Sequence, residues 1–138
     1  MTLYVLTVHQ PHAWAIATGR KPVENRPWRC HLPLGTVFAV HAGMKALHGG
    51  GLAVPQPDEP ETHVHGAIVA LVRFRGQHHA HECRRPDGLL CSPWAADAQV
   101  HWQIRLVHRL SEPIEVRGRQ TLWHAPDEVE DRLRPMLV

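Results

Sequence analysis

The distribution of hydrophobic and polar positions predicts a chain built mainly of short strands. Runs rich in β-branched and aromatic residues alternate with turns that contain Gly and Pro along most of the sequence. The run 66–75 is the most apolar and is expected near the centre of the sheet. Glu112 and Pro113 are expected to interrupt the alternating segment that begins at Val100. The predicted strands are 3–8, 23–26, 36–42, 66–75, 100–110 and 114–116.

The predicted helices are few and short. Pro11 suits the first turn of a helix over 12–18, which Gly19 is placed to end in the left-handed conformation. Another short helix is expected to start at 45–47, and a last one after Pro126, with acidic residues near its positive N-terminal end. Six or so strands with few flanking helices predict an α+β fold, a twisted and partly closed β-barrel.

Length and composition indicate one domain spanning residues 1–138. A chain of 138 residues suits a single core of ordinary size. No apolar run reaches the roughly 20 residues of a membrane-spanning helix, and the N-terminus lacks the features of a signal peptide. The odd number of cysteines, 3, argues against a disulfide framework and favours the reducing cytoplasm. The formal net charge of +2 is compatible with an anionic partner without requiring one.

Two loops stand out by their composition. The segment 49–61 holds glycines, prolines and acids, which predicts a flexible loop or lid within the domain. The segment 77–93 is rich in His and Cys, whose side chains raise the question of zinc. Their spacing matches no standard zinc site, so an exposed His-rich loop is the favoured interpretation, and no metal or other cofactor is predicted. The residues left open as metal ligands are His63, His65, His78, His79, His81, Cys83 and Cys91.

Polar and aromatic side chains gather in the segment 7–28. Glu24 and Arg26 point the same way on the predicted strand, and Lys21 in the preceding turn can join them. One interpretation is a solvated ion-pair face, which contributes little. The flanking tryptophans favour a binding pocket instead, although the first of them also suits a plain core position. The two tryptophans of the segment are Trp14 and Trp28.

These motifs resemble the ASCH domain (activating signal cointegrator homology), a relative of PUA domains. The usual pattern of that family is a strand, QPWA on a helix, GxKxxExRxW and a strand ending in IHA. The resemblance continues through VHWQI and LSEPIEVRGRQTLW, and so covers nearly the whole chain. The matching residues, in chain order, are Gln10, Pro11, Ala13, Trp14, Gly19, Lys21, Glu24, Arg26, Trp28, His41, Ala42 and Lys45.

The resemblance implies a PUA-like β-barrel whose cleft binds RNA or nucleotides. Some small bacterial members of the family resemble amidohydrolases that remove acyl groups from the N4 amine of cytidine. Those members use a lysine, a threonine three residues later and a distant glutamate. Lys21 matches the lysine, whereas Glu24 stands in the position of the threonine and His12 follows Gln10 and Pro11 in place of the commoner tryptophan.

Binding of RNA or of a small nucleoside or nucleotide, modified or unmodified, is the favoured function. A tryptophan would stack on a base, which is worth roughly 1–3 kcal/mol. Lys21 and Arg26 would hold phosphate, and Glu24 would accept a hydrogen bond from an exocyclic amine. The predicted ligand-binding residues are Gln10, Trp14, Lys21, Glu24, Arg26, Trp28, His41 and Lys45.

The alternative from the same side chains is hydrolysis of N4-acylcytidine. Lys21 would serve as nucleophile or proton shuttle and Glu24 as general base. A ribonuclease that uses His9 or His41 is a weaker enzyme variant. A protein-interaction adaptor, with the two unusual loops as contact surfaces, ranks last because it has no need of a Lys/Glu/Arg/Trp group.

Overall fold

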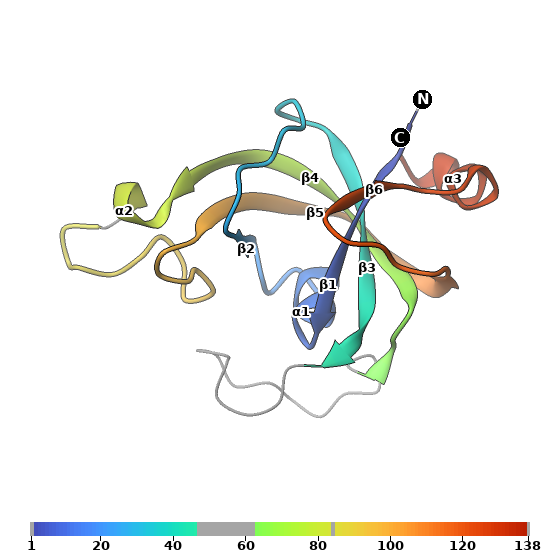
Figure 1. The fold of residues 1–138 in the computed structure, drawn as a ribbon, viewed down its shortest axis with the longest axis horizontal. Helices are drawn as coiled ribbons and strands as arrows, with labels where there is room; N and C mark the ends of the chain where they lie inside the picture. Colours follow the sequence, from blue (N-terminus) through green and yellow to red (C-terminus); the bar gives the residue numbers. More distant parts are fainter. Residues whose placement is uncertain (1, 47–62, 84, 138) are drawn as a thin grey trace.

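Within the described residues the chain forms one mixed sheet of six strands with short helices beside it (Figure 1). The computed structural model describes residues 2–46, 63–83 and 85–137. The sheet order is β2-β5-β4-β3-β1-β6, in which β1 and β3 run parallel and the other neighbours antiparallel. The strands are β1 (Tyr4–Gln10), β2 (Val23–Arg26), β3 (Val37–Ala46), β4 (Ala67–His79), β5 (Val100–Glu115) and β6 (Leu122–His124). The helices are α1 (His12–Ala17), α2 (Ala80–Cys83), α3 (Asp127–Leu133) and the 3₁₀ helix η2 (Arg134–Leu137).

The longest strands, β4 and β5, form a curved ribbon that ends at α2 (Figure 1). The expected break at Pro113 is wrong, because β5 continues through it as a single strand. Opposite the β4 segment 68–70, the paired residues on β5 move from Ile114 to Arg109. Pro113 therefore lies in an irregularity of the ladder, where its missing N–H leaves no regular hydrogen bond unmade.

Other expectations also change with strand pairing. Residues 45–46 continue β3 instead of beginning a helix, because Ala46 pairs with Gln10 of β1. The His-rich segment is partly regular, since β4 extends to His79 and α2 follows it. β6 is a strand that the sequence did not predict, and it pairs with β1. The predicted loop at 49–61 lies outside the described residues.

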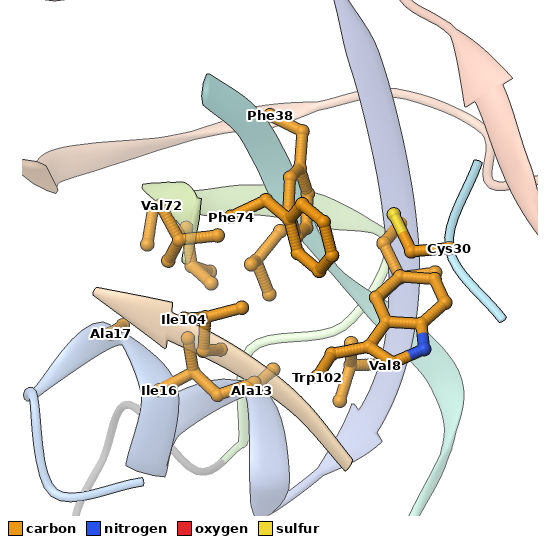
Figure 2. Packing of buried hydrophobic residues seen from close by; sticks show 14 of the residues in the cluster. Val8, Ala13, Ile16, Ala17, Cys30, Phe38, Val72, Phe74, Trp102 and Ile104 are labelled. Carbon is orange, nitrogen blue, oxygen red and sulfur yellow. The ribbon is translucent and has the colours of Figure 1, made fainter. Parts of the chain in front are cut away.

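Two hydrophobic cores lie on the two faces of the sheet. On one face Val8 of β1 packs with Ile16 of α1 and the fully buried Trp102 of β5 (Figure 2). On the other face Val5 packs with Leu133 of α3. Val5 and Val8 differ in parity along β1, and successive side chains of a strand point to opposite faces. α1 and α3 therefore pack on opposite faces of the sheet.

The sheet curls so that β2 returns opposite β1. Arg26 on β2 donates from Nη2 to the backbone oxygen of Thr7 on β1 at 2.7 Å, although three strands separate them in the sheet order. Backbone hydrogen bonds do not close the described strands into a barrel, and β2 and β6 remain the edge strands of the sheet. The predicted α+β class is confirmed, and the Arg26 side chain bridges the open side of the sheet. No helix in the described part of the chain is both long and apolar enough to cross a membrane.

Candidate functional site

A cleft of about 710 Å³ lies where β2 returns opposite β1. Three separate parts of the chain line it: the end of β1 with the start of α1, the segment around β2, and the loop before β6. Lys21, Glu24 and Arg26 all belong to this lining. The three side chains thus gather at one hollow instead of forming a fully solvated face.

The turn after α1 sets the position of Lys21. Gly19 has a φ of 77°, in the left-handed region that glycine adopts without strain. The chain then doubles back, and the amide of Lys21 donates to the carbonyl oxygen of Ala15 at 3.0 Å. β2 starts directly afterwards, with Glu24 paired opposite Trp102 of β5. The end of α1 therefore fixes the position of Lys21, and the pairing of β2 with β5 fixes that of Glu24, both without a ligand.

Glu24 is held between two cations. Its Oε1 accepts a hydrogen bond from Lys21 Nζ at 3.2 Å, and its Oε2 accepts from Nε and Nη2 of Arg26 at 3.0 and 2.9 Å. The side chains of Lys21 and Glu24 expose 2% and 6% of their surface, whereas that of Arg26 exposes 21%. A buried charge that keeps its partners avoids the large penalty of an isolated one. Of these three side chains, Arg26 presents the most surface to the cleft.

His12 joins this group as a neutral imidazole. Its Nδ1 lies 2.7 Å from Lys21 Nζ, and burial together with the Lys21 charge lowers the pKa of His12 to about 4. At neutral pH Nδ1 therefore accepts a hydrogen bond from the ammonium, and the ring proton sits on Nε2. Burial by itself would raise the pKa of Glu24, but Lys21 and Arg26 hold that pKa below its usual value. We call these four residues (His12, Lys21, Glu24 and Arg26) the ionic group.

The segment after α2 is tied to β2 beside the cleft. Asn25 donates from Nδ2 to the carbonyl oxygen of Trp94 at 2.8 Å, and its Oδ1 accepts from the amide of Ala96 at 2.9 Å. The Trp94 ring centroid lies 6.0 Å from Lys21 Nζ and 6.3 Å from the ring centroid of His12. The first distance is at the outer limit of a cation–π contact, and the second joins two rings that meet edge-on. Trp94 is thus the tryptophan that lies beside the ionic group.

The two tryptophans expected there lie elsewhere. Trp14 is 2% exposed and faces a separate hollow together with Gln10, because its position on α1 turns it towards the sheet. Trp28 is half-buried, and its ring packs edge-on against Trp102 with the centroids 4.9 Å apart. Neither side chain lines the cleft. The expected placement of both beside Lys21 is therefore corrected, and the core interpretation holds for Trp14.

Gln10 has structural partners at the start of α1. Its Oε1 accepts a hydrogen bond from the amide of Trp14 at 3.0 Å, and its Nε2 donates to the carbonyl oxygen of Val64 at 2.9 Å. The first bond satisfies an amide that the helix itself leaves unpaired. Lys45 belongs to β3, and its side chain lies outside the described part of the structure.

His41 lies in a second hollow of about 840 Å³, next to the cleft. The side chain is buried, with Nε2 2.7 Å from the carbonyl oxygen of Val116 and Nδ1 3.3 Å from Thr7 Oγ1. The two hollows share Thr7, Arg119 and Gln120 as lining residues. His41 and His9 therefore lie in different hollows, and both ring nitrogens of His41 already have partners.

The cleft also contains residues that the sequence did not single out as site residues. His12 and the loop 119–121 line it, and Arg119 is exposed there. The loop reaches the cleft because β6, which follows it, pairs with β1. No local sequence signal identifies that pairing.

A second polar group lies near the far end of the β4–β5 ribbon. Three of its four residues were candidate metal ligands, and the fourth, His101, is fully buried and was not predicted. The donor atoms of the four side chains all lie within 4.8 Å of one another. His63, His65, His79 and His81 are not among the four. The group, named the Cys/His group below, consists of His78, Cys83, Cys91 and His101.

Comparison with known proteins identifies the fold. No family model and no curated protein matches the chain by sequence. A solved structure of ASCH from Zymomonas mobilis matches with a TM-score of 0.59 and 14% identity, over 96% of this chain and 93% of that one. A point variant of that protein matches with a TM-score of 0.60 and 16% identity, over 98% of both chains. The chain therefore has the ASCH fold, which its sequence motifs had predicted.

Proposed function

We propose that the cleft binds a nucleotide, either free or within single-stranded RNA. The observation that carries this proposal is the charge of the lining. Lys21, Arg26 and Arg119 supply three cations against the one carboxylate of Glu24, counted over the described lining residues. Glu24 is already neutralised inside the ionic group, so the remaining positive charge is left for an anion.

The exposure of the cations divides their roles. Arg119 is exposed and Arg26 keeps 21% of its side chain exposed, so these guanidinium groups are the ones that can meet a phosphate. Lys21 is nearly fully buried, and its ammonium is engaged with His12 and Glu24. Its role in this proposal is to hold the ionic group together and to keep the cleft positive.

The neighbouring hollow continues the cleft and offers one further guanidinium, beside one carboxylate. It shares Thr7, Arg119 and Gln120 with the cleft, and it adds the exposed Arg117 against one carboxylate, Glu115. A single strand could place one nucleotide in the cleft and the next phosphate along this route. Because the chain has a formal net charge of only +2, a few nucleotides fit better than a long duplex.

Hydrolysis of an N4-acylcytidine is the second candidate, supported by the contact of 2.7 Å between Lys21 Nζ and His12 Nδ1. A lysine next to a neutral imidazole can pass a proton along a short relay. Against this role, Glu24 holds the same ammonium as an ion pair, and both of its oxygens accept from cations. An ammonium is not a nucleophile, and a carboxylate so engaged is a weak base for water. Binding is therefore the favoured function.

Fluorescence anisotropy of a labelled short single-stranded RNA tests the binding proposal. Arg119→Ala should weaken binding about tenfold, about 1.4 kcal/mol, and should reduce the salt dependence of the affinity. Arg75→Ala is the matched control, because Arg75 is exposed on β4 and does not line the cleft. Equal affinity of the Arg119 and Arg75 variants would overturn the proposal.

The same samples decide the second candidate. Incubation with N4-acetylcytidine followed by chromatography should show no release of cytidine. Release that is lost in Lys21→Ala would establish hydrolysis instead of binding alone.

A further inference from the structure

The Cys/His group is assembled from four different places on the chain. His78 stands near the end of β4, Cys83 ends α2, Cys91 lies in the following loop, and His101 is the second residue of β5. β4 and β5 pair His78 with His101, which places the two imidazoles side by side. The α2 turn and the loop then bring one thiol each to the same point. Such convergence of two sulfur and two nitrogen donors is typical of a metal site.

The spacing of the donor atoms fits one tetrahedral ion. Bonds of about 2.3 Å to sulfur and about 2.0 Å to nitrogen would separate two nitrogens by about 3.3 Å and a nitrogen from a sulfur by about 3.5 Å. His101 Nδ1 lies 3.2 Å from His78 Nε2 and 3.7 Å from Cys91 Sγ. These two separations match the edges of such a tetrahedron, and all four donor atoms lie within 4.8 Å of one another.

Neighbouring backbone groups orient two of the donors. His101 Nε2 lies 2.6 Å from the carbonyl oxygen of Ala96, to which it donates, so the lone pair of Nδ1 faces the group. The amide of Cys91 donates to Cys83 Sγ at 3.0 Å, which holds that sulfur beside the other donors. A histidine whose outer nitrogen donates to a carbonyl is the usual arrangement around a bound metal ion.

We propose that His78, Cys83, Cys91 and His101 bind one Zn²⁺ ion. Two thiolates and two imidazoles in tetrahedral array are the donors that zinc prefers over Mg²⁺ or Ca²⁺. Four protein ligands fill the coordination sphere and leave no position for a substrate, so the ion is structural. It joins α2 and the loop after it to the ends of β4 and β5.

The proposed ion is also linked through hydrogen bonds to Asn25, which lines the cleft. Ala96, the partner of His101, is bonded to Asn25 of β2, and Asn25 also holds Trp94. Trp94 in turn lies beside Lys21. Zinc would therefore hold the loop that places Trp94 next to the ionic group. This link to ligand binding rests on the proposed function, whereas the metal site itself does not.

Metal analysis of the purified full chain tests the site. Protein expressed in medium with added zinc should carry about one zinc ion per chain, as measured by inductively coupled plasma mass spectrometry. Cys83→Ser should lower the content at least tenfold, since it removes one of the four ligands. Cys30→Ser and His81→Ala are matched controls that should keep the metal, because Cys30 is buried elsewhere and His81 is an exposed neighbour outside the group.

Cobalt replacement keeps the test decisive if Cys83→Ser does not fold. The unaltered chain, stripped of zinc and loaded with Co²⁺ alone, should show the absorption of a tetrahedral ion with thiolate-to-cobalt charge transfer. A chain that takes up neither zinc nor cobalt in stoichiometric amount would overturn the proposal. A disulfide between Cys83 and Cys91 in protein purified under reducing conditions would overturn it too. Metal that is retained in Cys83→Ser but lost in His81→Ala would assign it to the exposed histidines instead.

Discussion

The ionic group and the Cys/His group are neighbours, yet their chemistry differs. In the β2–β5 pairing Glu24 lies opposite Trp102, and the next residue, Asn25, lies opposite His101. The ionic group contains both signs of charge, and its cations and its carboxylate satisfy one another. The Cys/His group contains only atoms that donate electron pairs. One group is complete in the chain alone, while the other is completed by a cation from outside.

This difference determines what each group contributes. A buried ion network is costly to desolvate and becomes strongly destabilising when one partner is removed. Thiol and imidazole donors are tolerated without an ion, but they gain a large binding energy when a metal joins them. We therefore expect the contribution of the ionic group to stability to change mainly when one of its residues is substituted. The contribution of the Cys/His group should change mainly with the supply of metal.

Glu24→Gln should have the largest effect on stability. It leaves two cations, Lys21 and Arg26, without their carboxylate, and loss of one partner from a buried pair costs about 3–5 kcal/mol. Urea unfolding followed by circular dichroism measures the free energy of unfolding. Asp131→Asn is the control, since its ion pair with Arg134 is exposed and should matter little. Equal losses in both variants would show that the ionic group is not a special source of stability.

Removal of metal should have the next largest effect. A ligand present at a hundred times its Kd stabilises the folded state by about 2.7 kcal/mol. For a chain of this size, a chelator should therefore lower Tm by about 5–10 °C. Hydrogen exchange should increase in peptides covering 85–99 but not in those covering 21–26. Increased exchange of both segments would contradict the view that only the Cys/His group needs an ion.

The pH dependence of stability should reveal the neutral histidine of the ionic group. The unfolded chain takes up a proton at His12 near pH 6.5, but the folded chain does so only at about 4. Stability should therefore fall as the pH drops from 6.5 to 4. His12→Gln should reduce this slope without abolishing it, because burial also lowers the pKa of His41. Urea unfolding at a series of pH values measures this slope of stability against pH. An unchanged slope in the variant would contradict the account.

Glu24 should add a separate loss at lower pH. Its pKa in the folded chain lies below its usual value of 4.5, so its contribution is present above that pH and is lost as the pH falls through the folded pKa. Glu24→Gln should show a flatter profile than the unaltered chain below pH 4.5. An equally steep loss below pH 4.5 in the Glu24→Gln variant would contradict this expectation.

Trp94→Ala should have the smallest effect, a modest loss of nucleotide affinity. Trp94 belongs to the loop that lies between the ionic group and the Cys/His group. If Trp94 stacks against a bound base, its loss should weaken nucleotide affinity by about 1 kcal/mol, roughly fivefold. Stability should change much less than in Trp14→Ala, where a buried tryptophan is removed from the core at a cost of about 3–5 kcal/mol. Anisotropy titrations and urea unfolding measure the two quantities. An unchanged affinity would remove Trp94 from the binding site.

The ionic group was largely predictable because its chemistry is local. Lys21, Glu24 and Arg26 belong to one turn and one short strand, so strand alternation alone places the two charged residues of β2 on one side. The same reasoning left Trp14 open between the core and the pocket, and the structure buries it. A short helix can turn its tryptophan to either neighbour, and only the packing of α1 against the sheet decides which.

The Cys/His group was only partly predictable because it depends on strand register. Cys83 and Cys91 attract attention in the sequence, but His101 reads as an ordinary residue of a strand. Its role follows from the pairing of β4 with β5, which no local pattern specifies. The continuity of β5 through Pro113 and the place of the loop 119–121 were missed for the same reason.

The most direct test of the proposed binding site is a titration of isotope-labelled protein with cytidine 5′-monophosphate, followed by two-dimensional NMR. The account predicts saturable shifts at Arg26, at the loop 119–121 and at the Trp94 indole, with small shifts at Arg75 and Trp14. Saturable shifts confined to residues outside the cleft, or no shifts at any nucleotide concentration, would contradict it.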